Sequence, residues 1–457
     1  MKTEINKERL VSDFYKSDGI IFASYDNLRK LPNYIDGLKI SQRKLLYTGF
    51  SKANKDFHKT EPFCNITATD QCYIHGPQNL IGIVSLMAAQ YVGSNNYSLF
   101  IGNDSGFGTR INPAYASGRY TKVKVSDIAK LLFNSVDDKI LEKQFFEGQY
   151  VEPKYLIPIF PVIFLNPSEG LSTGFSSSIF PRNPVEIIEY IKKKINGTEN
   201  PRMKLLPWFK GHLGKVEYNK ELDRNESFGI VIKNNMTSYT ITELPIGIDY
   251  KKYVDYLDKL SENGTIQDYD DYCDPKTDKI LFKIKTSREF TRKNENEHKL
   301  YETLHLIKSL PETLCFIDEN NRVREFKSIT EILDAFIDLR LKYYDLRKEY
   351  ILKTLFDNMM KMNSKYIFVK AIVDKKIIVA NKKKDEIIEQ IKATKGLIEI
   401  DGSYSYLLNM PIYNLSKEML EALRNDINDA KTEYDKINGT TIQDMWLNDL
   451  KELKKFL

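Results

Sequence analysis

Residues 101–133 read IGNDSGFGTRINPAYASGRYTKVKVSDIAKLLF, a glycine-rich loop followed by an ordered pattern. The alternation that opens TKVKVSDIAKLLF (121–133) predicts a strand, and the spacing after it predicts a helix. Two helical patterns precede the loop: DGLKISQRKLLYTGFSK at 36–52 and PQNLIGIVSLMAAQYVG at 77–93, the second of which opens after a Gly-Pro pair. This part of the chain therefore predicts helices, then a glycine-rich loop, then strands.

That order of elements is typical of a winged-helix DNA-binding module. Positive charge gathers in the same part of the chain: residues 1–130 carry 17 Lys and Arg against 11 Asp and Glu, whereas the remaining residues carry 51 against 52. A basic module joined to a near-neutral remainder fits a polyanion that binds one domain. From charge alone, the alternative is that the basic residues gather in this part of the chain by chance.

The rest of the chain predicts an α+β multidomain protein. Residues 150–180 read as apolar strands spaced by prolines, and residues 200–325 alternate short β-rich runs with polar helices. Two heptad stripes follow in the last 130 residues. The first is formed by Ile332, Phe336, Leu339, Tyr343, Leu346 and Tyr350, and the second by Leu420, Leu423, Ile427, Ala430, Tyr434 and Ile437. They could pair as an antiparallel arm with a small domain at its tip; an ordinary helical bundle is the alternative.

Composition and motifs exclude several classes of protein. The 457 residues are 42% apolar, which excludes an intrinsically disordered chain, and they contain neither a signal peptide nor an apolar run long enough to span a membrane. Four cysteines without a CxxC pair favour neither a disulfide framework nor a zinc site. No HExxH or P-loop motif occurs, and DYDDYCD (268–274) lacks the glycine and glutamate of a calcium loop. GNDSGFG (102–108) is only a weak dinucleotide pattern.

The most informative chemical group is Tyr120 in SGRYTKVKV (117–125). A phenol is a weak nucleophile at pH 7 because its unperturbed pKa is about 10. The neighbouring Arg119 could stabilise a phosphate under attack, since a guanidinium binds phosphate oxygens in a bidentate manner. Taken by itself, the segment leaves packing or a simple hydrogen bond to phosphate as alternatives for the tyrosine.

Longer stretches resemble the DNA breakage–reunion region of type IIA topoisomerases. DGLKISQRKLLYTGF (36–50) resembles the family's DGLKPxQRKxLY helix, and residues 75–100 resemble its HGEQSL…AQNFVGSNN stretch. SGFGTR (105–110) matches GQFGTR, ASGRYT (116–121) matches the SPRYIxT segment with the active-site tyrosine, and residues 157–176 resemble IPxxPxVLVNGxEGIGTGWS. Further similar segments follow in order at 205–217, 240–253, 336–352, 404–418 and 444–450.

The resemblance implies partners as well as a reaction. The chain contains neither an ATPase region nor the EGDSA and DxDxDG motifs of a toprim domain, and it lacks the repeated β domain of gyrase A. Its layout resembles the medium subunit of T-even-type phage topoisomerases. We therefore expect a homodimer that acts on double-stranded DNA, no membrane partner, and separate ATPase and toprim subunits. This chain is expected to bind no cofactor itself; Mg²⁺ and ATP would act through the partners. The location implied is the cytoplasm, of the host cell if a phage encodes the chain.

Residue roles carried over from the resemblance are expectations about this sequence. Tyr120 attacks a DNA phosphate and becomes linked to the 5′ end, while Arg119 holds that phosphate. Leu171 occupies the place of an isoleucine that wedges between base pairs and bends the duplex. The other expected DNA-binding residues are Lys39, Arg43, Lys44, His75, Arg110 and Lys122. Ile74, Pro77 and Gln78 depart from the family pattern, so contacts and drug sensitivity seen in relatives do not transfer at those positions.

The expected fold is an N-terminal helical and winged-helix domain over 1–155, an α/β tower domain over 156–325, and a long antiparallel coiled-coil arm. Residues 326–360 and 420–457 form the arm, and residues 361–419 form a small helical dimer gate at its tip. Two other functions compete with the topoisomerase. One is a non-catalytic winged-helix dimer that clamps and bends DNA. The other is a small-molecule enzyme that uses the loop at 102–108.

Overall fold

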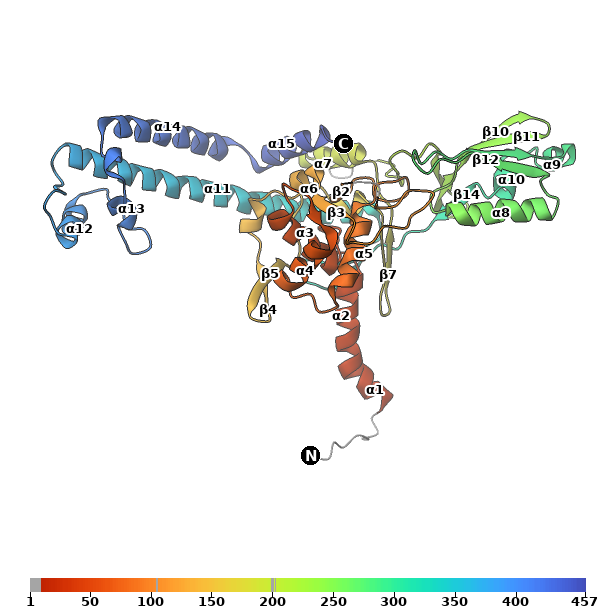
Figure 1. Cartoon of the computed structure of the whole chain (residues 1–457), viewed down its shortest axis with the longest axis horizontal. Helices are drawn as coiled ribbons and strands as arrows, with labels where there is room; N and C mark the ends of the chain where they lie inside the picture. Colours follow the sequence, from red (N-terminus) through yellow and green to blue (C-terminus); the bar gives the residue numbers. More distant parts are fainter. Residues whose placement is uncertain (1–9, 104–105, 199–200, 202) are drawn as a thin grey trace. The chain divides into compact units, whose positions relative to one another are not determined.

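The computed structural model describes residues 10–103, 106–198, 201 and 203–457. The first nine residues of the expected N-terminal domain, and residues 104–105 of the glycine-rich loop, lie outside the described residues. The chain divides into two compact units, Met1–Arg340 with Asp449–Leu457, and Leu341–Asn448. Figure 1 shows the elements of both units. No described helix is both long and apolar enough to cross a membrane.

Helices and a small sheet surround the segment that carries Tyr120. The helices are α3 (Ile40–Lys52), α4 (Thr60–Asp70), α5 (Pro77–Ala88) and α6 (Asp127–Leu132), and the antiparallel sheet has the order β1 (His58–Lys59), β3 (Lys122–Val125), β2 (Phe100–Gly102). The alternation at 121–125 is explained by β3, in which Val123 and Val125 are fully buried while Lys122 is exposed. The predicted strand-then-helix order over 121–133 is therefore confirmed by β3 and α6.

The expected apolar helix over 77–93 is shorter than the sequence pattern. It ends at Ala88 because Ala89 adopts an extended backbone, and the Asn95 side chain donates hydrogen bonds to the carbonyls of Leu86 and Ala89. Pro77 occupies the first helical position, where a missing N–H costs nothing. The helix expected over 36–52 likewise begins only at Ile40.

The proline-spaced run at 150–180 contains less strand than its composition predicts. Strands occur only at its two ends: β5 (Gln149–Pro153), which pairs with β4 (Lys143–Phe146), and the hairpin β6 (Ser168–Leu171) with β7 (Ser176–Ile179). Between them, residues 156–165 are buried, with one 3₁₀ turn at Val162–Phe164. Prolines at 158 and 161 lack the N–H that a ladder needs, so this segment fills the core without joining a sheet.

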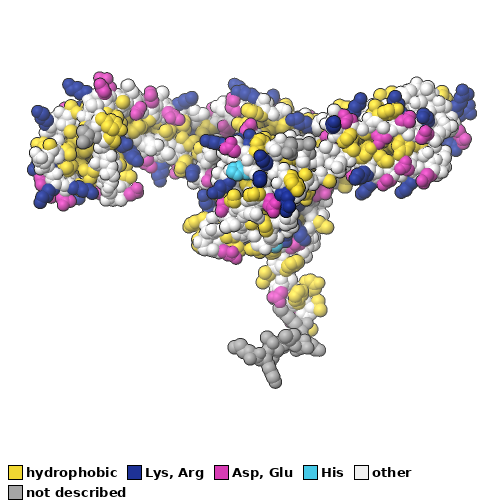
Figure 2. All heavy atoms as spheres, in the orientation of Figure 1, with side chains coloured by type: hydrophobic (Ala, Val, Ile, Leu, Met, Phe, Trp, Pro, Cys, Tyr) yellow, Lys and Arg dark blue, Asp and Glu magenta, His cyan; other side chains and the backbone are white. Residues whose placement is uncertain are grey.

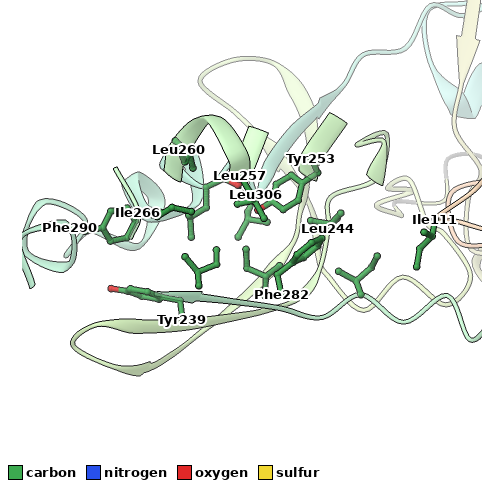
Figure 3. Packing of buried hydrophobic residues seen from close by; sticks show 14 residues of the cluster. Ile111, Tyr239, Leu244, Tyr253, Leu257, Leu260, Ile266, Phe282, Phe290 and Leu306 are labelled. Carbon is green, nitrogen blue, oxygen red and sulfur yellow. Dashed lines mark hydrogen bonds between the residues drawn. The ribbon is translucent and has the colours of Figure 1, made fainter. Parts of the chain in front are cut away.

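An α+β region follows α7 (Pro184–Ile195). A four-stranded antiparallel sheet has the order β10 (Ile230–Asn235), β11 (Ser238–Glu243), β13 (Phe282–Lys285), β12 (Asp268–Asp271). A three-stranded sheet has the order β14 (Ile307–Leu310), β9 (Arg224–Phe228), β8 (Val216–Asn219). A third sheet pairs β15 (Cys315–Ile317) with β16 (Val323–Glu325). Three helices accompany them, α8 (Tyr250–Glu262), α9 (Arg288–Lys293) and α10 (Glu297–Thr303). Figure 3 shows the apolar cluster formed here, which includes Tyr253 and Leu257 of α8 and Phe282 of β13.

The N-terminal helical stretch exposes apolar side chains. It consists of α1 (Val11–Phe14), a π-helical turn at Tyr15–Gly19 and α2 (Ile20–Lys30). Val11, Ile21 and Phe22 are each more than half exposed, and Figure 2 shows apolar side chains along this stretch. Only the last part of α2 is buried, at Asp26 and Asn27.

The second unit contains most of the long helix α11 (Ile329–Val373) together with α12 (Lys384–Ala393), α13 (Ser405–Leu408) and α14 (Lys417–Gly439). A small core of its own includes Phe368, Ile387, Ile391 and Leu407. The Lys348 ammonium of α11 donates to the carbonyls of Asn438 and Thr440 at the end of α14.

The two predicted stripes have different outcomes. On α14 all six residues of the second stripe are at least partly buried, whereas most of their neighbours are exposed, so that stripe is confirmed as the packed face. On α11 five of the six residues of the first stripe are likewise at least partly buried, and the stripe is wrong at Leu346, which is 46% exposed while its neighbours Tyr344 and Arg347 are buried. The Tyr344 ring stacks on Trp446 of α15 (Ile442–Lys454). At this point the buried face of α11 is therefore shifted by one residue from the predicted stripe.

Candidate active site

Tyr120 lies on a tight turn that leads directly into β3. Its amide donates to the Ser117 carbonyl at 2.9 Å, and its side chain is 74% exposed. The turn is fixed to the start of α4 on both sides of the tyrosine: the Glu61 amide donates to the Gly118 carbonyl, and the Thr60 and Thr121 hydroxyls lie 2.7 Å apart. The backbone around Tyr120 is thus held while its phenol faces solvent.

Gly118 allows this turn to lie close to α5. A Cβ added at Gly118 would approach Cγ2 of Ile81 to 2.8 Å, which is tighter than real side chains tolerate. A larger residue would push the turn away from the helix. The glycine two residues before Tyr120 therefore sets the distance between the tyrosine turn and the helical core.

Exposed positive side chains lie near Tyr120 in the chain and on the strand paired with β3. Arg119 and Lys122 are exposed, and Lys122 lies directly opposite the exposed Lys59 in the β1–β3 ladder. Like charges opposite one another destabilise a sheet, whereas they suit a site that binds an anion. Lys124, on the same strand, lies 4.9 Å from the centre of the Phe57 ring. Lys59 was not predicted from the sequence, where it directly precedes the mostly polar helix α4.

Arg43 and Lys44 are not on this surface, which corrects the expectation that they grip DNA. The Arg43 guanidinium donates to both oxygens of Asp36, at 2.6 and 3.1 Å, and to the Leu38 carbonyl, and the residue is 3% exposed. The Lys44 ammonium donates to Glu152 and to the Gln71 carbonyl. Burial raises the pKa of Glu152 although Lys44 opposes the shift. Both cations neutralise buried carboxylates.

Lys39 and Arg110 are both partly buried. Lys39 is partly buried at the start of α3; burial lowers its pKa, and the charge of Glu169 partly offsets that effect. The Arg110 guanidinium forms an ion pair of 2.5 Å with Glu243 and donates to the Leu244 carbonyl. Its side chain is only 11% exposed. Arg110 is therefore a largely enclosed cation held by an ion pair, unlike the exposed DNA-binding residue expected.

His75 belongs to a second cluster that is built around α2. Its Nε2 lies 2.5 Å from the Tyr25 hydroxyl, and its ring packs edge-on against Tyr73. Burial, followed by the positive charge of Arg29, lowers the pKa of His75, so the neutral ring is favoured at pH 7. These side chains line a cavity of about 270 Å³ that also contacts Phe145 and Phe146 of β4.

Leu171 lies at the end of β6 and is 77% exposed. The hairpin that carries it is fastened to α2, because both the amide and the hydroxyl of Thr173 donate to Asp26. Burial would raise the pKa of Asp26, but the hydrogen bonds from Lys30 and Thr173 outweigh it and hold this pKa below its ordinary value. A large apolar side chain is thus presented to solvent on an anchored hairpin.

The described residues contain no group of three or more His, Cys, Asp or Glu side chains that could hold a metal ion. The candidate site consists of an exposed phenol next to basic residues in the chain, with an anchored apolar side chain on a separate hairpin. Cations beside an exposed tyrosine can bind a phosphate and stabilise charge that develops on it. The geometry suits chemistry on a phosphodiester.

Comparison with known proteins gives relatives along nearly the whole chain. The mitochondrial DNA topoisomerase 2 of Dictyostelium discoideum is 30% identical over 99% of this chain and 35% of its own length. DNA topoisomerase 2 of Invertebrate iridescent virus 6 is 31% identical over 98% of this chain and 39% of its own length. This chain thus spans about a third of the length of these curated relatives.

A solved structure and a family model give the same result. The topoisomerase II DNA-binding, cleavage and re-ligation domain of Plasmodium falciparum superposes with a TM-score of 0.88 at 31% identity, over 97% of this chain and 64% of that one. A model of the family described as the A-type subunit of DNA gyrase/topoisomerase IV matches residues 29–451. The resemblance stated from the sequence is confirmed, and the chain belongs to this DNA gyrase/topoisomerase IV family of type II DNA topoisomerases.

Proposed function

We propose that this chain is the DNA-cleaving and rejoining part of a type II, ATP-dependent DNA topoisomerase, with Tyr120 as the nucleophile. The observation that supports this most is the exposed phenol on a fixed turn beside Arg119, Lys122 and Lys59. Capture of a covalent protein–DNA adduct through Tyr120 tests the proposal. A non-catalytic clamp that only bends DNA would form no such adduct.

In the proposed step the Tyr120 oxygen attacks a backbone phosphorus. A bond forms between that oxygen and phosphorus, the bond from phosphorus to the 3′ oxygen breaks, and the 5′ phosphate remains on the tyrosine. The phenol proton leaves, and the departing 3′ oxygen gains a proton. Arg119 and the two lysines stabilise the negative charge that gathers on the phosphate. One phosphoester replaces another, so the reverse attack by the 3′ hydroxyl restores the DNA.

We propose that Mg²⁺ and ATP act in the complete enzyme. The described residues do not offer a carboxylate cluster for a metal. We propose that metal and nucleotide sites lie on separate toprim and ATPase subunits that assemble with this chain on double-stranded DNA. When bound, the metal would supply charge stabilisation at the scissile phosphate.

Lys59 supplies a prediction about affinity. We expect Lys59→Ala to weaken binding to all DNA sequences alike and to reduce the slope of log affinity against log salt by about one, because one phosphate contact is lost. Fluorescence anisotropy over a salt series measures both. Lys55→Ala removes an exposed lysine outside the sheet and should leave the slope unchanged. If the Lys59→Ala and Lys55→Ala variants had the same slope of log affinity against log salt, Lys59 would not be part of the DNA-binding site.

Leu171 supplies a prediction about DNA shape. We expect Leu171→Ala to reduce DNA bending while changing affinity little, since cation–phosphate contacts supply most of the affinity and the wedge offsets an unstacking cost of a few kcal/mol. Energy transfer between dyes at the ends of a short duplex measures the bend. Leu222→Ala, another exposed leucine on the β8–β9 turn, is the matched control. An unchanged bend in Leu171→Ala would contradict the wedge.

The second unit supplies a prediction about assembly. We propose that two chains join through residues 361–419, where Ile378, Val379 and Tyr413 are exposed apolar side chains. Such surfaces pair about a two-fold axis. We expect a fragment over 326–457 to dimerise without DNA, and a fragment ending near 325 to remain monomeric, by sedimentation velocity. A monomeric 326–457 fragment at micromolar concentration would leave the ordinary helical bundle as the better interpretation.

A further inference from the structure

We propose that the α+β region positions the Tyr120 loop, through two adjacent residues, Ile111 and Arg110, that project from the loop into that region. This rests on the proposed role of Tyr120 and names the part of the fold that controls its placement. The loop of interest is the described stretch 106–120, which ends at the tyrosine. Ile111 and Arg110 are positioning residues and are not expected to contact DNA.

The first anchor is apolar. Ile111 is 9% exposed and belongs to the same buried cluster as Leu244, Tyr253 and Leu306 of the α+β region. Figure 3 shows Ile111 at one end of this cluster. An isoleucine from the tyrosine loop therefore completes a hydrophobic core that belongs to another part of the chain.

The second anchor is a buried ion pair with several hydrogen bonds. Besides the pair between Arg110 and Glu243, the Arg110 amide donates to the Asp278 carboxylate at 2.9 Å. Glu243 is 2% exposed, and it also accepts hydrogen bonds from the amides of Leu213 and Leu244. Glu243 is the last residue of β11, so the carboxylate that holds Arg110 is itself fixed by the four-stranded sheet.

The loop between these anchors and Tyr120 is closed on itself. The Ala116 amide donates to the Gly106 carbonyl at 2.8 Å, and the Thr109 amide donates to the Asn112 carbonyl. Gly108 has a φ of +84°, and a Cβ there would meet the Pro113 carbonyl oxygen at 2.6 Å. A loop crossed by such contacts moves as one body, so a shift at Arg110 is passed on toward residue 116.

Little else on the loop is buried. Residues 112–117 are all exposed, and so are Arg119 and Tyr120. Apart from Ile111, the buried side chain of the described loop is Phe107, which packs against Gly102 of β2. Loss of the Ile111 and Arg110 contacts would therefore leave residues 112–117 held mainly by the tyrosine turn, where Gly118 packs against Ile81 and accepts from the Glu61 amide. A loop with few buried contacts opens readily.

A misplaced nucleophile reacts slowly even when its chemistry is intact, because small displacements remove the aligned attack geometry. We expect Ile111→Ala and Arg110→Gln to slow DNA cleavage at saturating DNA by roughly 10- to 100-fold. DNA affinity should change less than threefold, since the exposed cations remain. Glu243→Gln, which keeps the shape and removes the charge, should give a smaller loss in the same direction.

Hydrogen exchange on the full chain tests the anchor without any cleavage assay. In Ile111→Ala and Arg110→Gln, amides of residues 112 and 114–120 should exchange at least tenfold faster, while those of β11 and β13 keep their protection. Leu260→Ala truncates the same cluster away from the loop, and Arg224→Gln breaks another Arg–Glu pair of the region; both should leave loop exchange unchanged.

Two results would overturn the proposal. One is unchanged exchange of residues 112 and 114–120 in both loop variants. The other is equal acceleration in the loop and in β11 and β13, which would mean that the two residues serve only the stability of the core. The exchange measurement does not depend on the reaction. If Tyr120 proved not to be the nucleophile, faster exchange in the loop variants would still establish the anchor. If exchange disproved the anchor, the proposed role of Tyr120 as nucleophile would still stand.

Discussion

Replacing Tyr120 with phenylalanine is expected to abolish DNA cleavage and to leave DNA binding and dimerisation intact. The substitution removes one oxygen from a side chain that is 74% exposed, so it leaves no cavity and no unsatisfied partner. Without that oxygen no phosphotyrosyl bond can form. End-labelled DNA, trapped with denaturant in the assembled enzyme, measures the adduct. We expect it to fall to background, with DNA affinity changed less than twofold.

The matched control is Tyr115→Phe, which removes a phenol oxygen from the same loop. Tyr115 is also exposed, but its hydroxyl lies toward Gly82 of α5. We expect this variant to cleave DNA normally. A covalent adduct that persists in Tyr120→Phe would contradict the assignment, and so would loss of cleavage in Tyr115→Phe alone.

The second large effect is on stability. Arg43→Ala should lower the free energy of unfolding by about 3–5 kcal/mol, the usual cost of breaking a buried ion pair by removing one partner. Asp36 would be left charged in the interior, where its side chain is 0% exposed and also accepts the amides of Leu38 and Leu156. Urea unfolding followed by fluorescence measures the loss.

Arg119→Ala gives the opposite pattern and serves as the control. Arg119 is exposed, so its removal should leave the unfolding midpoint unchanged and slow cleavage instead. If Arg43→Ala unfolded at the same urea concentration as the natural chain but lost DNA affinity, the buried ion pair would be the wrong description and the sequence-based expectation of a DNA contact would be restored.

Local patterns in the sequence located the elements that depend on neighbours in the chain. The alternation of TKVKV predicts β3, and the spacing on α14 predicts its packed face, because both follow from the periodicity of one element. On α11 the same logic failed at Leu346, whose neighbours Tyr344 and Arg347 are the buried residues. There the buried face is set by Trp446, about 100 residues along the chain, and heptad spacing carries no information about that partner.

Basic residues were the least predictable part of the site. A lysine that binds DNA and a lysine that neutralises a buried acid look alike in sequence. Lys44 pairs with Glu152 and Arg110 with Glu243, each more than 100 residues away, so no local pattern could separate them from Lys122. Arg43 was within reach, since its partner Asp36 precedes it by seven residues across a turn at Gly37.

The most direct test of the central claim is to identify the residue that carries the DNA end. The chain, assembled with the subunits proposed to supply metal and ATP, is trapped on DNA, digested with nuclease and protease, and sequenced by mass spectrometry. We predict a nucleotide joined through its 5′ phosphate to Tyr120 in the peptide that contains ASGRYTK. A modified residue elsewhere, or a 3′ linkage, would contradict the account.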